Sequence, residues 1–207
     1  MAIFVLMLLQ AQQSAGFLQK INDIDHALFF KINGSWHNSF FDLIFPFTRE
    51  AFFWGPFYLF LFLFVSINFK KYGLWWAIFM IVTAAVSDFI SSSVIKEFFF
   101  RLRPCNDASV AEHIRFLVKY CPQSSSFTSS HAVNHFAAAM FIFATLRQKF
   151  KTKWLALIFI WAAIPCYAQI YVGVHFLGDI LAGMVLGLFI GFCMAYLFKK
   201  IAGKLNL

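Results

Sequence analysis

Seven residues that could bind a phosphate or take part in its transfer lie near the ends of hydrophobic segments in this sequence. They are Lys96, Arg103, Ser129, Ser130, His131, His175 and Asp179. Cations combined with backbone N–H groups at a helix N-terminus form an anion site, for which phosphate is the obvious ligand. Two histidines beside one phosphate can divide the reaction, because one can attack phosphorus while the other protonates the leaving oxygen. A carboxylate on the far nitrogen of the attacking imidazole would fix its tautomer.

Each of these residues alone has an ordinary structural explanation. The basic residues could anchor helices at the membrane interface, and Asp179 could complement the positive N-terminus of the helix that it opens. Asp179 would share a helix face with His175 in a continuous helix, whereas Gly173 and Gly178 favour a turn at His175. The gathering of ionisable groups at one membrane face still favours a functional site, because such groups are costly at membrane depth.

A metal centre is the competing explanation for the histidines. His131 and His135 have the i, i+4 spacing that can chelate zinc, but their segment contains no acidic or thiol ligand. Lys96 and Arg103 would also repel a cation. The sequence therefore predicts a site that uses neither a metal nor any other cofactor.

The elements that position these residues are predicted to be membrane-spanning helices. Of the 207 residues, 61% are hydrophobic, 13% are charged and 31 are Phe, whereas a soluble domain carries about 25% charged residues. The formal net charge of +8 does not indicate a nucleic-acid partner, because the basic residues fall in short clusters between apolar runs. The sequence predicts an all-α integral membrane bundle that forms a single domain over residues 1–207.

Five segments have the apolar character of a membrane span, which needs roughly 20 residues. They are residues 51–69, 73–95, about 131–146, 154–178 and 180–198. These spans make up a predicted transmembrane catalytic core over residues 51–198, followed by a basic cytoplasmic tail over residues 199–207. Residues 1–50 suit a segment that lies in the membrane interface. The sequence leaves open whether residues 1–17 add a sixth span, and a signal peptide is the less favoured alternative.

The loops between these spans differ in charge. Nine basic residues and no acids occupy the segments 70–71, 147–153 and 199–204, which marks that side as cytoplasmic. The loop at residues 96–130 and the turn near His175 lie on the opposite side. The candidate site is therefore predicted to face outward.

Cys105 and Cys121 both lie in this outer loop. A disulfide between them would close a loop of about 17 residues and contribute roughly 3 kcal/mol in the chain-entropy model. It would also agree with an oxidising compartment. The alternative is two free thiols that never meet.

Other patterns are interpreted as scaffold. Gly183, Gly187 and Gly191 repeat every four residues, which allows the last helix to pack closely on a neighbour. Asp88 and the serines around it predict a polar network between helices, with Asn134 packed behind the site. The Phe-rich first span is expected to face lipid.

Three stretches resemble the motifs of the type 2 phosphatidic acid phosphatase superfamily, membrane lipid phosphate phosphatases that share a site design with vanadium-dependent haloperoxidases. The family's Lys-x6-Arg-Pro motif is matched by KEFFFRLRP at residues 96–104. Its Pro-Ser-Gly-His motif is matched in part by TSSH at 128–131, and its Ser-Arg-x5-His-x3-Asp motif by AQIYVGVHFLGD at 168–179. The resemblance covers roughly residues 20–198 and implies an all-helical bundle with its site at the membrane surface.

The resemblance also implies a role for each site residue. Lys96, Arg103, Ser129 and the backbone at Ser130 would hold the phosphate oxygens. His131 would be the general acid for the leaving group. His175 would form a phosphohistidine, oriented by Asp179, which water would then hydrolyse without a metal.

Two departures from the family motifs matter. Thr128 and Ser130 replace the proline and glycine of the second motif, and Gln169 replaces the arginine of the third. Glutamine brings no charge and no bidentate fork. Loss of a charge-assisted contact of about 1.5–3 kcal/mol predicts phosphate binding or transition-state stabilisation about 10- to 100-fold weaker. Arg101 could compensate only if its side chain points into the site.

The expected function is that of a bacterial inner-membrane lipid phosphatase whose site faces the periplasm. Candidate substrates are undecaprenyl pyrophosphate, phosphatidylglycerophosphate, phosphatidate and lipid A phosphates, with a polyprenyl or glycerolipid slightly favoured because the outer loop is short. One alternative is a phosphotransferase that passes phosphate to an acceptor lipid. Another is a catalytically weakened membrane scaffold, motivated by Gln169. The sequence does not determine the oligomeric state.

Overall fold

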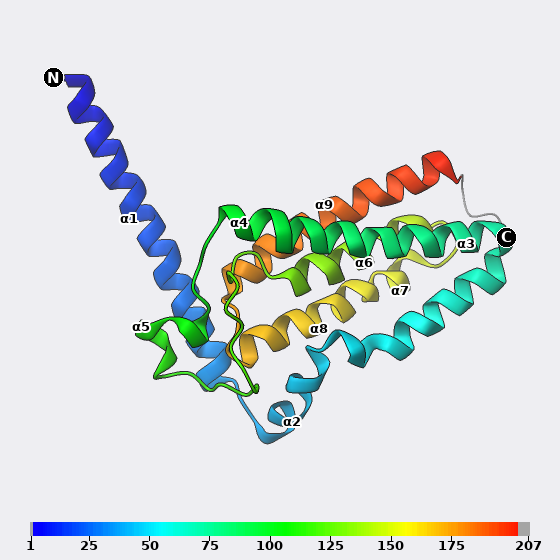
Figure 1. The fold of residues 1–207 in the computed structure, drawn as a ribbon, viewed down its shortest axis with the longest axis horizontal. Helices are drawn as coiled ribbons and strands as arrows, with labels where there is room; N and C mark the ends of the chain where they lie inside the picture. The colour runs from blue at the N-terminus through cyan, green and yellow to red at the C-terminus, as the bar shows by residue number, and fades with distance from the viewer. Residues whose placement is uncertain (1, 203–207) are drawn as a thin grey trace.

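The computed structural model describes residues 2–202, with side chains from residue 16 onward, and every element in that range is helical (Figure 1). The α-helices are α1 (Ala2–Phe30), α2 (Ser39–Thr48), α3 (Gly55–Phe89), α4 (Lys96–Phe98), α5 (Ala108–Ala111), α6 (Ser130–Leu146), α7 (Thr152–Leu155), α8 (Leu157–Tyr171) and α9 (Leu177–Ile201). Short π- or 3-10-helical segments are η1 (Lys31–Ser35), η2 (Ala51–Trp54), η3 (Ile90–Ile95) and η4 (Pro104–Asn106). The all-α prediction is confirmed.

Helix α3 is a hairpin of two long arms. The backbone leaves helical geometry at Lys70, with φ 49° and ψ −123°, and the chain reverses direction there, so that the two arms spread apart from the turn (Figure 1). The two arms correspond to the predicted spans at residues 51–69 and 73–95. Together with α6, α8 and α9 they form the bundle.

Three helical stretches are long and apolar enough to cross a membrane within the described part of the chain. They are Ala51–Phe98, which contains the hairpin, Thr152–Tyr171 and Leu177–Ile201. Helix α6 is apolar but shorter, with 17 residues. These stretches agree with an integral membrane protein, whereas a total of five crossings stays a prediction.

The two ends of the bundle differ in chemistry. The hairpin at Lys70, the connection from α6 to α7 and the end of α9 lie together at one end, and they carry the basic clusters (Figure 1). The segments that carry the motif residues lie at the other end. Residues 203–207 of the predicted basic tail lie outside the described residues, while residues 199–201 continue α9.

The N-terminal region consists of two helices that differ in their packing. Helix α1 projects from the site end of the bundle, and the last part of the helix packs Phe29 into the core beside Phe176 (Figure 1). Helix α2 packs against α8, with Phe45 in a cluster that includes Ala168 and Tyr171. Placement of residues 1–50 in the membrane interface remains a prediction.

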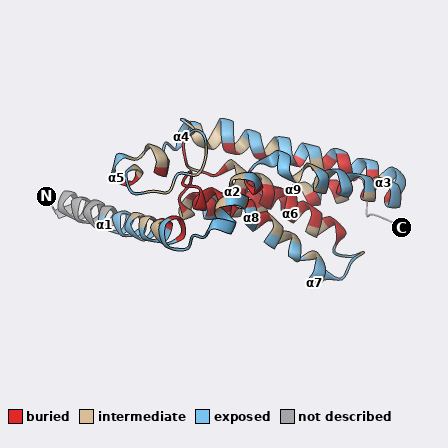
Figure 2. Ribbon diagram, turned by 90° about the horizontal axis from the view of Figure 1, so that it is seen from below, coloured by how far each residue is buried: buried red, intermediate tan, exposed pale blue. Residues whose placement is uncertain are grey.

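Helix α6 lies inside the bundle, and most of its residues are buried (Figure 2). It packs closely on the glycine face of α9. A Cβ added at Gly183 would lie 2.8 Å from the Ser129 carbonyl oxygen, and one at Gly187 or Gly191 would collide with a backbone oxygen of α6. Since only glycine permits this approach, the packing predicted from the four-residue repeat is confirmed.

We expect Gly187→Ala to destabilise the protein by about 1–3 kcal/mol, because the new methyl group collides with the Val133 carbonyl in a packed core. Thermal unfolding of the purified protein in detergent would measure the change. Gly34→Ala is the matched control, since a Cβ there meets no atom within 4 Å. Equal unfolding temperatures for the two variants would contradict the close contact.

Candidate active site

His175 occupies a turn between α8 and α9. Helix α8 ends at Tyr171 and α9 begins at Leu177, so the predicted span over residues 154–178 is too long at its outer end. Gly173 makes the turn with φ 87°, a conformation that side chains with a Cβ rarely adopt. The glycines around His175 therefore indicated its position correctly, and Asp179 lies in the first turn of the helix that follows.

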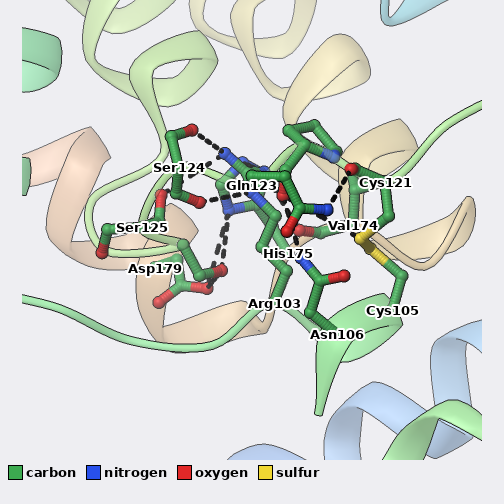
Figure 3. The surroundings of a disulfide bond; sticks show 12 residues. Arg103, Cys105, Asn106, Cys121, Gln123, Ser124, Ser125, Val174, His175 and Asp179 are labelled. Carbon is green, nitrogen blue, oxygen red and sulfur yellow. Dashed lines mark hydrogen bonds and ion pairs between the residues drawn. A yellow bond between two sulfur atoms is a disulfide. The ribbon is translucent and has the colours of Figure 1, made fainter.

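The His175 imidazole is buried and contacts Arg103 (Figure 3). Its Nε2 lies 2.9 Å from Arg103 Nη1. A guanidinium has only donors, so Nε2 accepts this hydrogen bond and the ring proton resides on Nδ1. Burial lowers the pKa of His175 to about 4, and the Arg103 charge adds to this effect while Asp179 opposes it. The ring is therefore neutral at pH 7, with its lone pair on Nε2 directed toward a cation.

Ser126 connects His175 to Asp179. The imidazole Nδ1 lies 3.2 Å from Ser126 Oγ, whose hydroxyl donates to Asp179 Oδ2 at 2.5 Å. The direct separation from Nδ1 to Asp179 Oδ2 is 3.6 Å, beyond a hydrogen bond. The expected contact between carboxylate and imidazole thus runs through a serine that the motif comparison did not single out. Nothing in the run at residues 124–126 distinguishes it from its neighbours.

We expect Ser126→Ala to lower kcat/KM about 10- to 100-fold, because it removes the hydrogen bond between a buried carboxylate and the hydroxyl that orients Nδ1. Steady-state phosphate release would measure the loss. Ser109→Ala is the control, since that exposed hydroxyl only donates to Asp107, the N-cap residue of α5. An unchanged rate in Ser126→Ala would indicate that Asp179 orients the ring without the serine.

Asp179 is fully buried and shares Arg101 with Asp25 of α1. Arg101 Nη1 lies 2.9 Å from Asp179 Oδ1, and its Nη2 lies 2.8 Å from Asp25 Oδ2. The guanidinium also stacks 4.3 Å from the centre of the Phe176 ring, and Asp25 accepts from the Gly178 backbone N–H. These contacts use both ends of the guanidinium. Arg101 fastens α1 to the start of α9 and does not compensate for Gln169.

Arg103 is held by the loop before α6. Its Nε donates to the Ser124 carbonyl at 3.0 Å, and its Nη2 donates to Ser124 Oγ and to the Ser125 carbonyl. Its Nη1 contacts the Val174 carbonyl as well as His175. Burial lowers the pKa of Arg103 to about 10, and the charge of Asp179 limits this decrease. The side chain therefore stays cationic at neutral pH and is fixed beside Nε2.

The disulfide between Cys105 and Cys121 fastens the same two segments together (Figure 3). The Cα atoms of the two cysteines are 6.0 Å apart. Cys105 lies two residues after Arg103, and Cys121 lies three residues before Ser124. Asn106 Nδ2 adds a hydrogen bond to the Pro122 carbonyl. The covalent link thus supports the loop contacts that orient the Arg103 guanidinium.

The N-terminus of α6 brings His131 to the same place. His131 interacts electrostatically with His175 and with Lys96, and Lys96 interacts with Arg103. His135 Nδ1 donates to the His131 carbonyl at 2.9 Å, while its buried Nε2 has no partner within the described residues. Cations and histidines from three separate segments therefore converge at one end of the bundle.

The two predicted serines have structural contacts. Ser129 caps α6 by accepting from the Ala132 N–H, and its own N–H donates to the Asp179 carbonyl at 3.2 Å. Ser130 Oγ lies 3.0 Å from Ser92 Oγ. Their hydroxyls are thus engaged within the protein, which leaves the helix N-terminus as their contribution to an anion site.

Gln169 is buried on α8, and its side-chain Nε2 has no hydrogen-bond partner within residues 2–202. An unpaired buried donor is costly, so a ligand acceptor would complete it. The described residues also contain no group of three or more His, Cys, Asp or Glu positioned to hold a metal ion.

A predominantly apolar cavity of about 670 Å³ extends from the histidines between the arms of α3 and α6. His131, His135 and Asp88 lie at its polar end, and the remaining lining is mostly hydrophobic. The other lining residues are Ala51, Tyr58, Leu59, Leu61, Phe62, Trp76, Ala77, Met80, Ile81, Ala84, Ser130, Asn134 and Ala138. Residues of the first span therefore line this cavity, whereas its composition led us to expect a span that faces only lipid.

The predicted polar network lies behind this cavity. Asn134 Nδ2 donates to Asp88 Oδ1 at 3.1 Å, and Asn134 Oδ1 accepts from Ser87 Oγ at 2.7 Å. Ser92 Oγ also approaches Asp88 at 3.4 Å. These contacts join the second arm of α3 to α6 and confirm the interhelical network.

Comparison with known proteins agrees with the motifs. The PAP2 superfamily model matches residues 73–202. The lipid A 4′-phosphatase of Bacteroides thetaiotaomicron is 27% identical over 192 residues, covering 91% of this chain and 83% of that protein. The lipid A 4′-phosphatase of Porphyromonas gingivalis is 33% identical over 114 residues, covering 54% of this chain and 46% of that protein.

Two solved structures resemble the fold. The transmembrane PAP2-type phosphatidylglycerolphosphate phosphatase of Bacillus subtilis aligns with a TM-score of 0.69 and 20% identity, over 88% of both chains. LpxE of Aquifex aeolicus aligns with a TM-score of 0.58 and 25% identity, over 84% of this chain and 93% of that one. The family match, the relatives and the convergence of the motif residues lead to one conclusion. The chain belongs to the PAP2 superfamily and is a membrane phosphomonoester hydrolase.

Proposed function

We propose that this protein removes a phosphate group from a lipid A-type lipid through a phosphohistidine formed on His175. The observation that carries the proposal is the neutral, buried His175, whose Nε2 lone pair is directed at the Arg103 guanidinium. A phosphate bound by Arg103 lies within reach of this nitrogen. A nucleophile and an anion-binding group are therefore adjacent before the substrate arrives.

The reaction then has two displacements. His175 Nε2 attacks phosphorus, the bond from phosphorus to the lipid oxygen breaks, and His131 donates a proton to that oxygen. Asp179 stabilises the imidazolium through Ser126, which keeps Nδ1 protonated. Water then attacks the phosphohistidine, giving its proton to His131, and inorganic phosphate leaves. Both histidines return to their starting states.

Arg103 and Lys96 would hold the phosphate oxygens during both steps. The Arg103 guanidinium is already oriented by Ser124 and Val174, so little reorganisation is needed when charge develops. The helix N-terminus at Ser130 adds backbone donors. This arrangement suits phosphoryl transfer, in which positioning and electrostatic stabilisation account for most of the catalysis.

The apolar cavity supports a lipid as the leaving group. His131 and His135 line it together with mostly hydrophobic side chains, so an acyl chain could occupy it while the head group meets the histidines. The short outer loop favoured a polyprenyl or glycerolipid substrate, whereas both curated relatives carry the name lipid A 4′-phosphatase. We therefore place lipid A phosphate first among the candidates.

The charge distribution supports a site on the periplasmic face of a bacterial inner membrane. The basic clusters occupy the opposite end of the bundle, as expected for cytoplasmic loops (Figure 1). The Cys105–Cys121 disulfide belongs to the site end, which agrees with an oxidising compartment.

Phosphate release from a panel of purified lipids in detergent tests the proposal. The panel contains lipid A, phosphatidylglycerophosphate, phosphatidate and undecaprenyl pyrophosphate, with His175→Ala as the inactive control. We expect free phosphate from lipid A at the highest rate. Loss of substrate only after an acceptor lipid is added, with the phosphate recovered on that lipid and not as free phosphate, would instead identify a phosphotransferase. No turnover of any lipid would favour the membrane scaffold.

A further inference from the structure

The site lacks one cation that the family motif would supply. Gln169 occupies the motif position, and its buried Nε2 has no partner within the described residues. Arg101, the nearest basic residue in sequence to the first motif's arginine, is committed to Asp25 and Asp179. A replacement charge must therefore come from outside the three motifs.

Arg49 directly follows α2, a helix that lies against α8. One turn before it, the Phe45 ring contacts the rings of Tyr167 and Tyr171 at 5.5 and 4.8 Å. These tyrosines are one turn apart on α8, the helix that also carries Gln169. The end of α2 is thus held beside the helix that carries the missing charge.

A second set of contacts joins the end of α2 to the histidines. Trp54 Nε1 donates to the Thr48 carbonyl at 2.8 Å, and the Trp54 ring lies 5.8 Å from Trp161. Trp161 in turn lies 5.3 Å from His135, whose ring is stacked on that of His131. The residues next to Arg49 in the chain are therefore linked both to α8 and, through Trp161, to the histidines of α6.

The Arg49 side chain is nine-tenths buried, with a relative exposure of 9%. Its Nε lacks a hydrogen-bond partner within residues 2–202, although Glu50 Oε1 lies 3.4 Å away in an unsuitable geometry. The Glu50 side chain is 60% exposed, so water screens its charge. A buried cation with such a weak counter-ion favours binding of an anion.

The charge of Arg49 also interacts with two residues of the site, Arg103 and His131. Burial lowers the pKa of Arg103 most, Asp179 opposes that change, and Arg49 lowers the pKa further. Arg49 interacts electrostatically with His131 as well. Arg49 therefore adds positive charge to that of Arg103 near the histidines, which favours an anion there.

We infer that Arg49 is a phosphate-binding residue that supplies the positive charge absent at Gln169. The inference rests on the proposed phosphatase function and adds a cation from α2 to those of the three motifs. Arg49 and Arg103 would hold different oxygens of the same phosphate, with Gln169 Nε2 available as a neutral donor.

A double-mutant cycle between Arg49 and Gln169 tests this inference. We expect Arg49→Gln to lower kcat/KM about 10- to 100-fold, and Arg49→Lys to retain an intermediate rate because it keeps the charge but loses the fork. In the Arg49→Gln background, Gln169→Arg should raise kcat/KM at least about tenfold. In the wild type, the same substitution should change kcat/KM by less than about threefold. Arg115→Gln is the control, an arginine that contacts α2 through Asp42 outside the site.

Binding of inorganic phosphate provides a readout that does not depend on turnover. Phosphate should raise the unfolding temperature of the wild type and of Arg115→Gln, and should raise that of Arg49→Gln much less at the same concentration. This measurement separates the two proposals. A wild type that releases no phosphate from any lipid but shows Arg49-dependent phosphate binding would overturn the function and support the role of Arg49.

Three results would overturn the inference. They are wild-type activity and phosphate binding in Arg49→Gln, an equal effect of Gln169→Arg in both backgrounds, and a loss in Arg115→Gln as large as that in Arg49→Gln. If Arg49→Gln does not fold, Arg49→Lys keeps the test decisive. Equal phosphate affinity and kcat/KM in Arg49→Lys and the wild type would then overturn the inference, because a phosphate-binding arginine should lose affinity when its fork is removed.

Discussion

Replacement of His175 by alanine is expected to lower the rate of phosphate release by about 10⁴-fold or more, because it removes the nucleophile around which the site is arranged. The imidazole is buried, neutral and directed by Nε2 toward Arg103. Phosphate release from lipid A in detergent would measure the loss. His113→Ala is the control, since that histidine is exposed and belongs to none of the three motifs.

A comparison with His131→Ala separates the nucleophile from the general acid. With a substrate whose leaving group needs no proton, such as p-nitrophenyl phosphate, His131→Ala should lose much less activity than with a lipid phosphate. His175→Ala should be inactive toward both. Equal losses of His131→Ala on the two substrates would exclude its role as the acid, and residual turnover in His175→Ala above the detergent blank would exclude a phosphohistidine.

The second large effect is expected at Arg101. Arg101→Ala should destabilise the protein by about 3 kcal/mol and also reduce activity, because it leaves the buried carboxylates of Asp25 and Asp179 without their shared cation. The apparent unfolding temperature and the rate of phosphate release would report the two losses. The aromatic contact with Phe176 is lost in the same variant.

Arg115→Ala is the matched control for this prediction. Arg115 also pairs with a single aspartate, Asp42, but both side chains are about one-quarter exposed or more, with values of 26% and 31%. Exposed pairs contribute about 0–1 kcal/mol, so its unfolding temperature should change little. If Arg101→Ala were as stable as Arg115→Ala, the link between α1 and Asp179 would be unimportant for the fold.

Several features of the site could be inferred from residue types and spacing. His175 and Asp179 are four residues apart at a glycine-marked helix start, and that geometry depends on local backbone conformation. The glycine repeat on α9 likewise predicted its close contact with α6, because small residues at a four-residue interval lie on one helix face. Local periodicity was sufficient for these assignments.

Other features depended on contacts between distant segments. The bridge from His175 through Ser126 joins residues 49 positions apart, and the pair of Arg101 with Asp25 joins residues 76 apart. Arg101 and Arg103 are equivalent in charge and separated by one residue, yet Arg101 binds Asp25 of α1 and Arg103 faces His175. Sequence spacing could not distinguish them, since their directions depend on how the outer loop packs.

The amino-acid sequence by itself determined the membrane class, the motif residues and the replacement of a cation by the neutral Gln169, because composition and short-range spacing carry that information. The hydroxyl that connects Asp179 to His175, the carboxylate of α1 that shares Arg101, and the buried Arg49 beside α8 emerged from the packing of α1, α2 and the outer loop onto the bundle. The physical reason is that a buried charge selects its partner by proximity in space, and helices far apart in the chain supply those partners here.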